Sequence, residues 1–361
     1  MNVFQKSTYY LSLVFSTLMV YFVFAENPMH LGSIIGYVLA GYILMHLSEK
    51  FKEHKKTMIL MIFLAGLPLV LVKVLAVFKI SGLGFLGISY MTFKLIQIII
   101  EIYDGLIEKP MGPLDYVHFL LFFPALSSGP IDRSRRFLED WKKQRTKDEY
   151  LELAGTGLFR LVLGLFYKLV ISGMVFQQMT SIRYKDFSFF VIYMYLYTAY
   201  LFFDFAGYSL MAVGASNILG IETPMNFNVP FISVDIKDFW NRWHITLSTW
   251  LRDFVFSRIV MRFMRKKIFK KRLTTAMVAY MINMTFMGFW HGITLNYIAY
   301  GFYHGILMAA FEWYQKKSKF YKKNKNKTWY KVISWIITMH LVMFGFLIFS
   351  GKMSEWARKL I

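Results

Sequence analysis

The feature that most constrains this chain is the length of its apolar runs. The longest lie at residues 11–25, 31–47, 58–78, 189–203 and 332–349. Several approach the ~20 residues that an α-helix needs to cross ~30 Å of hydrocarbon. Because lipid offers no hydrogen-bond partners to the backbone, a chain with many such runs must span as helices. The sequence therefore predicts an all-α, multi-pass transmembrane protein and excludes a soluble or secreted enzyme.

We predict about nine to eleven membrane segments, including re-entrant ones, along a single membrane-embedded domain that covers residues 1–361. The complete spans are expected near residues 8–25, 31–48, 57–78, 84–103, 156–180, 187–203, 274–290, 294–313 and 332–350. Segment 114–130 is apolar but is interrupted by Pro124, which is typical of a re-entrant hairpin. Segment 204–256 is too polar to span and too aromatic for a solvated loop, so interfacial helices are expected there.

The charge of the chain follows the predicted topology. The net charge is +21, from 42 Lys and Arg against 21 Asp and Glu. The basic residues are concentrated in hydrophilic segments at 50–56, 133–147, 262–272 and 316–331, which is the distribution expected of cytoplasmic loops between membrane spans. This explains the charge better than nucleic-acid binding does. Cysteine is absent, which excludes thiolate nucleophiles and Cys-ligated metal, and we predict no metal site.

Isolated polar residues within the apolar runs have simple structural explanations. Four lie near span ends, where snorkelling or a structural ion pair is expected: Lys73, Lys94, Glu101 and Lys168. Four histidines lie at loop edges, where a solvated or interfacial position is expected: His30, His46, His54 and His118. His340 lies mid-span and is expected to form a hydrogen bond between packed helices.

A denser polar cluster lies between residues 204 and 253. It begins at Asp204 and continues through 224–228 to Asn241, Arg242, His244 and Ser248. If 238–253 is one helix, Asp238 and Arg242 are i,i+4 partners and Ser248 stands four residues after His244. An amphipathic interfacial helix is the alternative, anchored by Trp240, Trp243 and Trp250. That alternative explains the tryptophans but not the polar residues between them.

A second polar site follows at Trp290-His291-Gly292, with Tyr303-His304-Gly305 in the next span. His291 ends the apolar run 281–290. The glycine after it allows another backbone or a ligand to approach closely. A histidine that caps a helix at the membrane interface accounts for this feature equally well.

Taken in order, these motifs resemble the membrane-bound O-acyltransferase family, and within it the branch that attaches D-alanine to teichoic acid. The resemblance rests on segment 238–248, on Trp290-His291-Gly292 located 47 residues after His244, and on segments 128–133, 202–210, 226–232 and 251–256. It runs from about Leu86 to the end of the chain. Relatives usually carry one more membrane segment before the span near Thr8. The resemblance implies the fold of that family.

The resemblance also implies roles for individual residues. His291 matches the catalytic histidine of the family, and we assign it as the general base on the acceptor hydroxyl. His244 matches the second, partly shared histidine, and we expect it to orient or polarise the reacting groups. The remaining supporting residues are Asn241, Arg242, Trp243, Asp204, Ser248 and Trp290. Since the chain has no cysteine and no G-x-S-x-G motif, direct transfer without an intermediate on the protein is favoured.

The donor and partners follow from the same resemblance. The donor would be a D-alanyl thioester on the phosphopantetheine arm of a small, acidic, cytoplasmic carrier protein, with no cofactor bound to this chain. The eventual acceptor would be lipoteichoic acid, and other membrane proteins of the D-alanylation pathway would assist. The resemblance places the protein in the cell membrane of a Gram-positive bacterium, surrounded by lipid bilayer.

A docking site for such a carrier is predicted at residues 258–268. Val260, Met264 and Ile268 fall on one face of a helix there. Basic residues flank that face: Arg262, Arg265 and Lys266. A basic rim around an apolar stripe suits an acidic helical partner. A cytoplasmic loop with an interfacial helix explains the same pattern.

Three other functions remain open on the sequence alone. An acyltransferase with a different donor, such as an O-acetyltransferase of an exported polysaccharide, would share the histidine motifs. A transporter or flippase could contain broken segments and an intramembrane Asp204, although no pair of matching interrupted segments is present in the two halves of the sequence. A non-catalytic scaffold for an envelope complex is the third.

Overall fold

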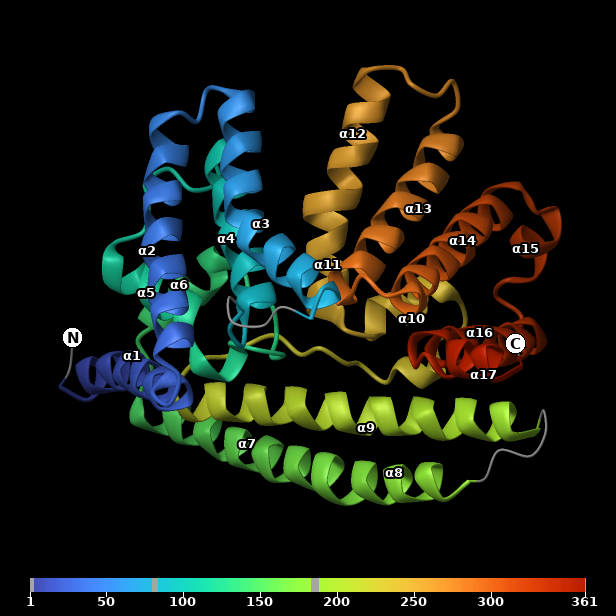
Figure 1. Cartoon of the computed structure of the whole chain (residues 1–361), viewed down its shortest axis with the longest axis horizontal. Helices are drawn as coiled ribbons and strands as arrows, with labels where there is room; N and C mark the ends of the chain where they lie inside the picture. Colours follow the sequence, from blue (N-terminus) through green and yellow to red (C-terminus); the bar gives the residue numbers. More distant parts are fainter. Residues whose placement is uncertain (1–2, 80–83, 183–187, 361) are drawn as a thin grey trace. The chain divides into compact units, whose positions relative to one another are not determined.

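The computed structural model describes residues 3–79, 84–182 and 188–360, with side chains described from residue 10 to residue 356. The predicted span 187–203 therefore begins at a residue outside the described part. Within that part, the regular structure is helical throughout (Figure 1), which confirms the all-α prediction. The helices longer than 15 residues are α1 (Val3–Phe24), α2 (Pro28–Lys50), α3 (Lys55–Val77), α4 (Ile88–Tyr103), α7 (Lys147–Leu165), α9 (Ser188–Ile218), α13 (Arg272–His291), α14 (Leu295–Lys317) and α16 (Thr328–Phe349).

The shorter elements connect these helices. They are α5 (Pro113–Leu121), α6 (Ser134–Lys142), α8 (Ser172–Ser181), α10 (Ile236–Arg242), α11 (Ile245–Leu251), α12 (Ser257–Arg265), α15 (Lys319–Asn324) and α17 (Lys352–Leu360). Two π-helical turns, Phe166–Ile171 and Arg252–Phe256, join α7 to α8 and α11 to α12.

Five helical segments among the described residues are long and apolar enough to cross a membrane. They are Pro28–Lys50, Lys55–Val77, Lys147–Ser181, Ser188–Ile218 and Thr328–Phe349. All five coincide with predicted spans. The other predicted spans are also helical, in α1, α4, α13 and α14, and the total of nine to eleven membrane segments stays a prediction.

Helix α9 extends further than the sequence predicted. The expected span ended at residue 203 because Asp204 follows, yet the helix continues to Ile218. The Oδ1 atom of Asp204 lies 2.5 Å from Nζ of Lys168. Pairing lowers the cost of a carboxylate in an apolar helix, so the helix need not end there. The ion pair predicted for Lys168 is confirmed, and its partner is Asp204.

The described residues divide into two compact units. The first comprises Met1–Leu165 and Tyr208–Met225, and the second comprises Phe166–Gly207 and Asn226–Ile361. Each is described by itself below, and the prediction of a single domain stays a prediction.

In the first unit, helix α4 is buried along most of its length. Of the two expectations for Lys94 and Glu101, snorkelling is wrong for both. The structural ion pair is confirmed for Glu101, whose Oε1 lies 4.0 Å from a guanidinium nitrogen of Arg135. Lys94 is 1% exposed, and its Nζ donates to the carbonyl of Phe119 at 3.0 Å. Glu101 is 3% exposed and accepts a hydrogen bond from Ser134 at 3.0 Å. Both side chains are satisfied by α5 and α6, which the sequence did not place against α4.

The solvated position expected for His118 is also wrong. This histidine is fully buried on α5, where its Nε2 lies 2.9 Å from the hydroxyl of Ser12. Its ring lies 3.9 Å from that of Trp141 on α6, measured between centroids. A residue near a loop in the sequence can thus be central in the packing, because α1 and α6 cover it.

The interrupted segment predicted at 114–130 is a short helix followed by a tight turn. Helix α5 ends at Leu121, and a 3₁₀ turn follows at Phe123–Ala125. A side chain at Gly129 would lie 2.6 Å from the carbonyl oxygen of Pro124, so only glycine lets the chain return so closely. The broken backbone is confirmed, and its re-entrant course in a membrane stays a prediction.

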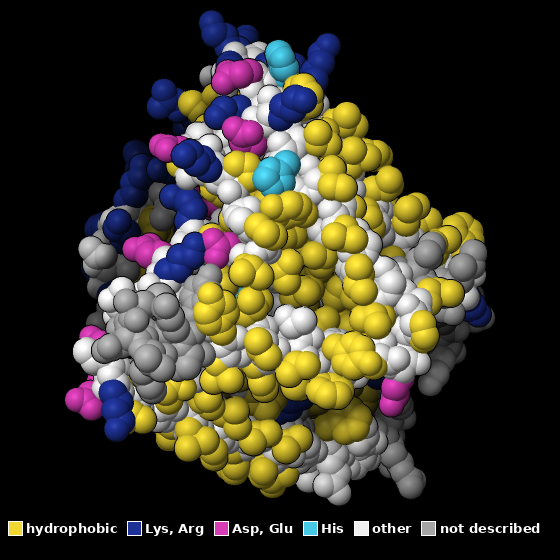
Figure 2. Space-filling view, turned by 90° about the vertical axis from the view of Figure 1, so that its left-hand side faces the viewer, with side chains coloured by type: hydrophobic (Ala, Val, Ile, Leu, Met, Phe, Trp, Pro, Cys, Tyr) yellow, Lys and Arg dark blue, Asp and Glu magenta, His cyan; other side chains and the backbone are white. Residues whose placement is uncertain are grey.

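The surface of α2 fits a lipid environment. Ile35, Leu39 and Ile43 are spaced one turn apart and are each more than half exposed. Figure 2 shows hydrophobic side chains across much of one face of the molecule, with Lys and Arg gathered toward its upper end. An apolar surface of this extent would be unfavourable in water, so it supports membrane embedding.

In the second unit, α13 and α14 form a closely packed pair that carries His291. A Cβ at Gly288 would lie 2.4 Å from the carbonyl oxygen of Tyr297, and one at Gly301 would lie 2.4 Å from that of Met284. The two backbones thus touch without intervening side chains, as membrane helices do at small residues. His291 is held at the end of this pair.

Candidate active site

The polar cluster predicted on one helix is divided between two. Helix α10 ends at Arg242 and α11 begins at Ile245. Between them His244 adopts the left-handed conformation, with φ of 44° and ψ of 51°. The prediction of a continuous helix over 238–253 is therefore wrong. The i,i+4 pair is confirmed, since Nε of Arg242 lies 2.7 Å from Oδ1 of Asp238.

The break at His244 is held by a preceding extended segment. The backbone N–H of Ile245 donates to the carbonyl of Asn226 at 2.9 Å, and that of Asn228 donates to the carbonyl of Arg242 at 3.0 Å. The side chain of Asn226 accepts from the hydroxyl of Thr246 at 2.5 Å. A left-handed conformation at a residue other than glycine costs about 1–2 kcal/mol, and these bonds offset it. Strain of this kind is concentrated at functional positions.

His244 lies in an almost fully enclosed position, with 4% of its surface exposed. The ring of Phe205 meets it edge to face at 4.7 Å between centroids. Burial, and to a smaller extent the nearby charge of His291, lowers the pKa of His244 to about 3. The imidazole is therefore neutral at physiological pH. Its Nδ1 has no hydrogen-bond partner among the described residues, so it can still bind a polar group of a ligand.

His291 is the last residue of α13 and is surrounded by aromatic rings. The ring centroids of Trp290, Phe349, Tyr297 and Tyr300 lie 4.7, 5.1, 6.2 and 6.2 Å from its own. A Cβ at Gly292 would lie 2.4 Å from the ring of Tyr297. The close approach expected at this glycine is therefore made by an aromatic side chain, which packs under the end of the helix.

The structure brings the two histidine motifs together although 47 residues separate them. The ring of Trp290 lies 4.7 Å from that of His291 and 6.5 Å from that of His244. Two histidines in an enclosed aromatic setting can handle a proton where water is largely excluded.

The predicted supporting residues are only partly in this cluster. Trp243 packs among Phe227, Phe239 and Phe346, at 5.1, 5.6 and 4.7 Å between ring centroids. Arg242 is occupied by Asp238 and by the carbonyl of Asn228. Asp204 pairs with Lys168. The contacts of these three residues hold neighbouring segments in place.

The burial of the tryptophans argues against the alternative that they anchor an interfacial helix in a membrane belt. Trp240, Trp243 and Trp250 are 7, 4 and 2% exposed. All three are core residues of the second unit.

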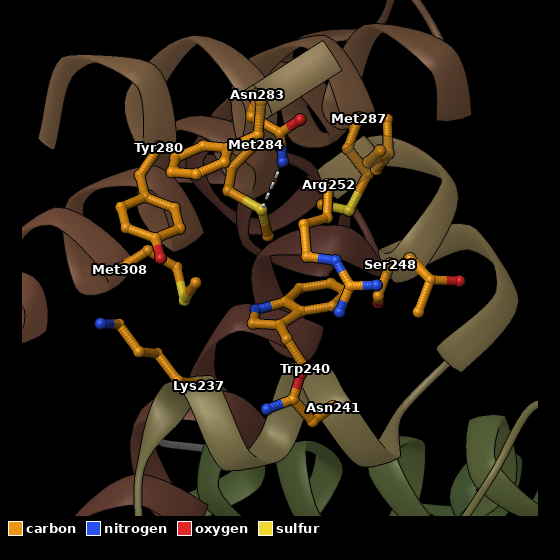
Figure 3. Close-up of a pocket in the computed structure, with 13 residues that line it drawn as sticks. Lys237, Trp240, Asn241, Ser248, Arg252, Tyr280, Asn283, Met284, Met287 and Met308 are labelled. Atoms are coloured by element: carbon orange, nitrogen blue, oxygen red, sulfur yellow. Dashed lines mark hydrogen bonds between the residues drawn. The ribbon is translucent and has the colours of Figure 1, made fainter. Parts of the chain in front are cut away.

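A cavity of about 180 Å³ lies in the second unit. It is lined by the segment from α10 to the π-helical turn, by α13 and by α14 (Figure 3), and neither His244 nor His291 is among its lining residues. Two predicted residues, Asn241 and Ser248, line it. The remaining lining residues were not predicted: Lys237, Trp240, Thr249, Leu251, Arg252, Phe256, Tyr280, Asn283, Met284, Met287 and Met308. Met287 stands one helical turn before His291 on α13. The side-chain oxygen of Asn283 is buried there without a hydrogen-bond partner among the described residues.

Known proteins identify the family of this fold and site. The sequence profile of the membrane-bound O-acyltransferase family matches residues 35–353. The chain belongs to the membrane-bound O-acyltransferase family. The match begins well before Leu86, where the motif resemblance was expected to start, and it covers both histidine motifs.

Relatives of this chain include teichoic acid D-alanyltransferases and alginate O-acetylases. A teichoic acid D-alanyltransferase of Bacillus subtilis is 46% identical over 75% of this chain and 69% of the relative. One of Streptococcus thermophilus is 40% identical over 98% of this chain and 91% of the relative. A probable alginate O-acetylase of Pseudomonas syringae is 32% identical over 74% of this chain and 49% of the relative.

Two contacts between helices support the wall of the acyltransferase cavity and do not follow from the local sequence. Lys237 pairs with Glu312, and its Nζ lies 2.9 Å from Oε1 of Gln315. The indole N–H of Trp240 donates to Nδ1 of His304 at 3.3 Å. His304 thus fixes a tryptophan in the cavity wall, which explains the Tyr303-His304-Gly305 motif. Pairing across helices is a long-range property, which sequence spacing does not reveal.

The acyltransferase holds no recognisable metal centre in its described part. No group of three or more His, Asp or Glu side chains there is arranged to hold a metal ion.

The helix predicted for carrier docking is shorter than expected. Helix α12 ends at Arg265, and Lys267 has a positive φ of 51°. Ile268 therefore lies beyond the helix, and its predicted alignment with Val260 and Met264 on one helical face is wrong. Met264 and Ile268 are 43 and 49% exposed, and Met261 adds another exposed apolar side chain at 58%. Arg262, Arg265 and Lys266 are also exposed, so an accessible apolar surface with a basic rim remains.

Proposed function

We propose that this protein transfers D-alanine from the thioester of a carrier protein across the cell membrane of a Gram-positive bacterium, toward lipoteichoic acid. The observation that carries the proposal is the similarity to a teichoic acid D-alanyltransferase along nearly the full length of both chains. The similarity to the alginate O-acetylase covers only about half of that relative. The enclosed histidine pair supplies the chemistry that either acyl transfer needs.

In the proposed reaction His291 acts as the general base. It takes the proton of the acceptor hydroxyl, and the oxygen attacks the thioester carbonyl. When the carbon–sulfur bond breaks, the proton held by His291 passes to the departing sulfur, so that the donor leaves as a free thiol. His244 is neutral and has a buried Nδ1 with no partner among the described residues, which suits it to orient a polar hydrogen of the reacting groups rather than to carry charge.

The cavity lined by α10, α11, α13 and α14 suits the arm of the donor. Phosphopantetheine is a chain of methylene groups interrupted by two amides. Asn241 and Asn283 offer amide side chains, and Met284, Met287 and Met308 offer an adaptable apolar wall. The buried oxygen of Asn283, which no described residue bonds, can accept from an amide N–H. The charge of Lys237 is compensated by Glu312, so the wall that it forms does not repel or trap a neutral arm.

Reconstitution tests this function directly. The purified protein in liposomes is supplied with carrier charged with labelled D-alanine and, in parallel, with carrier charged with an acetyl group. We expect D-alanine to appear on an added lipoteichoic acid, and the acetyl donor to be used poorly. Transfer of acetyl but not of D-alanine would place the protein with the polysaccharide acetylases. Transport of an intact glycolipid without acyl transfer would favour a flippase.

Carrier binding is predicted to depend on the exposed apolar surface of α12. Val260→Asp places a charge within this surface and repels an acidic carrier, so we expect at least a tenfold loss of affinity. Phe51→Asp is the matched control, because Phe51 is an exposed apolar residue in a different basic loop. Affinities are measured by biolayer interferometry with the protein in nanodiscs. If both variants bind the carrier like the parent protein, α12 is not the dock.

A further inference from the structure

A second cavity, with a volume of about 480 Å³, lies in the same unit, and no histidine lines it. Its lining residues belong to α14, α15, α16 and the start of α10, helices that are labelled in Figure 1. Its walls are apolar and aromatic, and include Phe311, Tyr314, Phe320, Trp329, Ile333 and Ile337. Several of these are half exposed, among them Phe320, Ile333 and Ile337 at 55, 50 and 54%. The cavity is therefore a groove open along the side of α16.

The few polar groups in this groove are already satisfied by the protein. The hydroxyls of Ser334 and Thr338 donate to the carbonyl of Val234, at 2.6 and 3.3 Å. Asp235 accepts from the backbone N–H groups of Lys237 and Asp238, both at 2.9 Å. A ligand in the groove therefore finds contact surface but few free hydrogen-bonding groups. That favours hydrocarbon over a peptide or a sugar, whose polar atoms would lose their hydrogen bonds to water.

One end of the groove is strongly basic. Segment 316–331, which runs from the end of α14 into the start of α16, carries eight exposed lysines: Lys316, Lys317, Lys319, Lys322, Lys323, Lys325, Lys327 and Lys331. No Asp or Glu occurs between residues 313 and 354 to offset them. Lysine clusters of this size next to a membrane helix attract anionic lipid headgroups. Each lysine near the surface contributes about 1 kcal/mol of binding free energy.

The dimensions of the groove match a single leaflet. Its lining on α16 runs from Trp329 to Leu341, which is an advance of twelve residues or about 18 Å of helix. Half of a hydrocarbon core of ~30 Å is about 15 Å. Trp329, Tyr330 and Phe320 lie at the basic end, where aromatic side chains are enriched at the level of lipid headgroups. The lysines, the aromatic residues and the apolar walls thus follow one another in the order of headgroup, interface and acyl chain.

We propose that this groove is a binding site for an anionic glycerophospholipid, with an acyl chain against α14 and α16 and the phosphate on the lysines of segment 316–331. The site shares no lining residue with the cavity that Asn241 and Asn283 line, and it does not depend on the acyl-transfer reaction. The lysines favour an anionic headgroup, and the apolar walls favour an acyl chain.

Native mass spectrometry of the detergent-solubilised protein tests the proposal. Titration with phosphatidylglycerol is compared with titration with phosphatidylcholine of the same acyl chains. We expect phosphatidylglycerol to bind at least tenfold more tightly, with one lipid retained at the highest collision energies. In the variant Ile333→Trp/Ile337→Trp, which fills the groove, retention of that lipid should be lost. In Lys322→Gln/Lys323→Gln/Lys325→Gln the preference for phosphatidylglycerol should fall at least threefold.

Two controls separate this site from general lipid attraction. Ile336→Trp adds the same bulk to α16 at an exposed residue outside the groove lining, and it should retain the lipid. Phosphatidylglycerol with brominated acyl chains should quench the tryptophan fluorescence of the parent protein. The quenching should be weaker in Trp329→Phe, and this test does not depend on a variant that fills the groove. Equal binding of the two lipids, retention in the filled variant, or co-purification of a protein in place of lipid would each overturn the proposal.

Discussion

Replacing His291 by alanine is expected to lower the rate of D-alanyl transfer by about 10²–10⁴-fold, the range typical for loss of a general acid–base group. The imidazole lies at the end of α13 against the rings of Trp290 and Phe349. Alanine keeps the helix and its glycine contacts intact, so the affinity for the carrier should change little. The assay is single-turnover transfer of labelled D-alanine from a charged carrier, with thermal stability measured in parallel.

Two further variants test the role of His291: His340→Ala, which is a control, and His244→Gln. His340→Ala removes a histidine whose ring bonds the hydroxyl of Tyr195 at 2.6 Å, and it should retain transfer. Because the pKa of His244 is lowered to about 3, His244 stays neutral down to that pH. Any loss of activity between pH 7 and pH 5 should therefore persist in His244→Gln. Transfer that survives in His291→Ala at the parent rate would remove His291 from the mechanism.

Replacing Gly301 by leucine is expected to have the largest effect on folding. Even a Cβ there would lie 2.4 Å from the carbonyl oxygen of Met284 and 2.8 Å from Cα of Gly288. A backbone atom cannot move aside as a side chain can, so α13 and α14 must separate. The cost is at least the ~1–3 kcal/mol typical of overpacking, and the melting temperature in detergent should fall by several degrees.

Gly173→Leu is the control for this substitution. Gly173 lies on α8 and is exposed, and a Cβ at this residue would have no atom within 4 Å. The variant should melt like the parent protein, and its transfer activity should be unchanged. Equal melting temperatures for the two leucine variants would show that the close contact of α13 and α14 does not stabilise the fold.

The parts of this protein that follow from local pattern could be predicted from its sequence. The long helices α2, α3, α9 and α16 follow from apolar length alone. The Asp238–Arg242 pair follows from helical spacing. The proximity of His244 and His291 came from the family resemblance, since no spacing rule connects residues 47 apart.

The predictions that failed depended on contacts between distant segments. Lys94 and His118 were expected near solvent, and they are buried because α5, α6 and α1 cover them. Helix α9 continues past Asp204 because Lys168 lies beside it. The break at His244 depends on Asn226, eighteen residues earlier. In each case the local sequence favours one exposure or conformation of a residue, and a contact with a distant part of the chain stabilises another.

The glycine contact between α13 and α14 has a consequence for how the enzyme can move during turnover. Two helices whose backbones touch at Gly288 and Gly301 cannot slide or rotate past each other without a clash of carbonyl groups. His291, Tyr297 and Tyr300 therefore travel as one rigid body. The opposite wall is built differently, from two short helices joined at a strained residue. We therefore expect any change in the spacing of His244 and His291 to arise from movement of this wall and not from the α13–α14 pair.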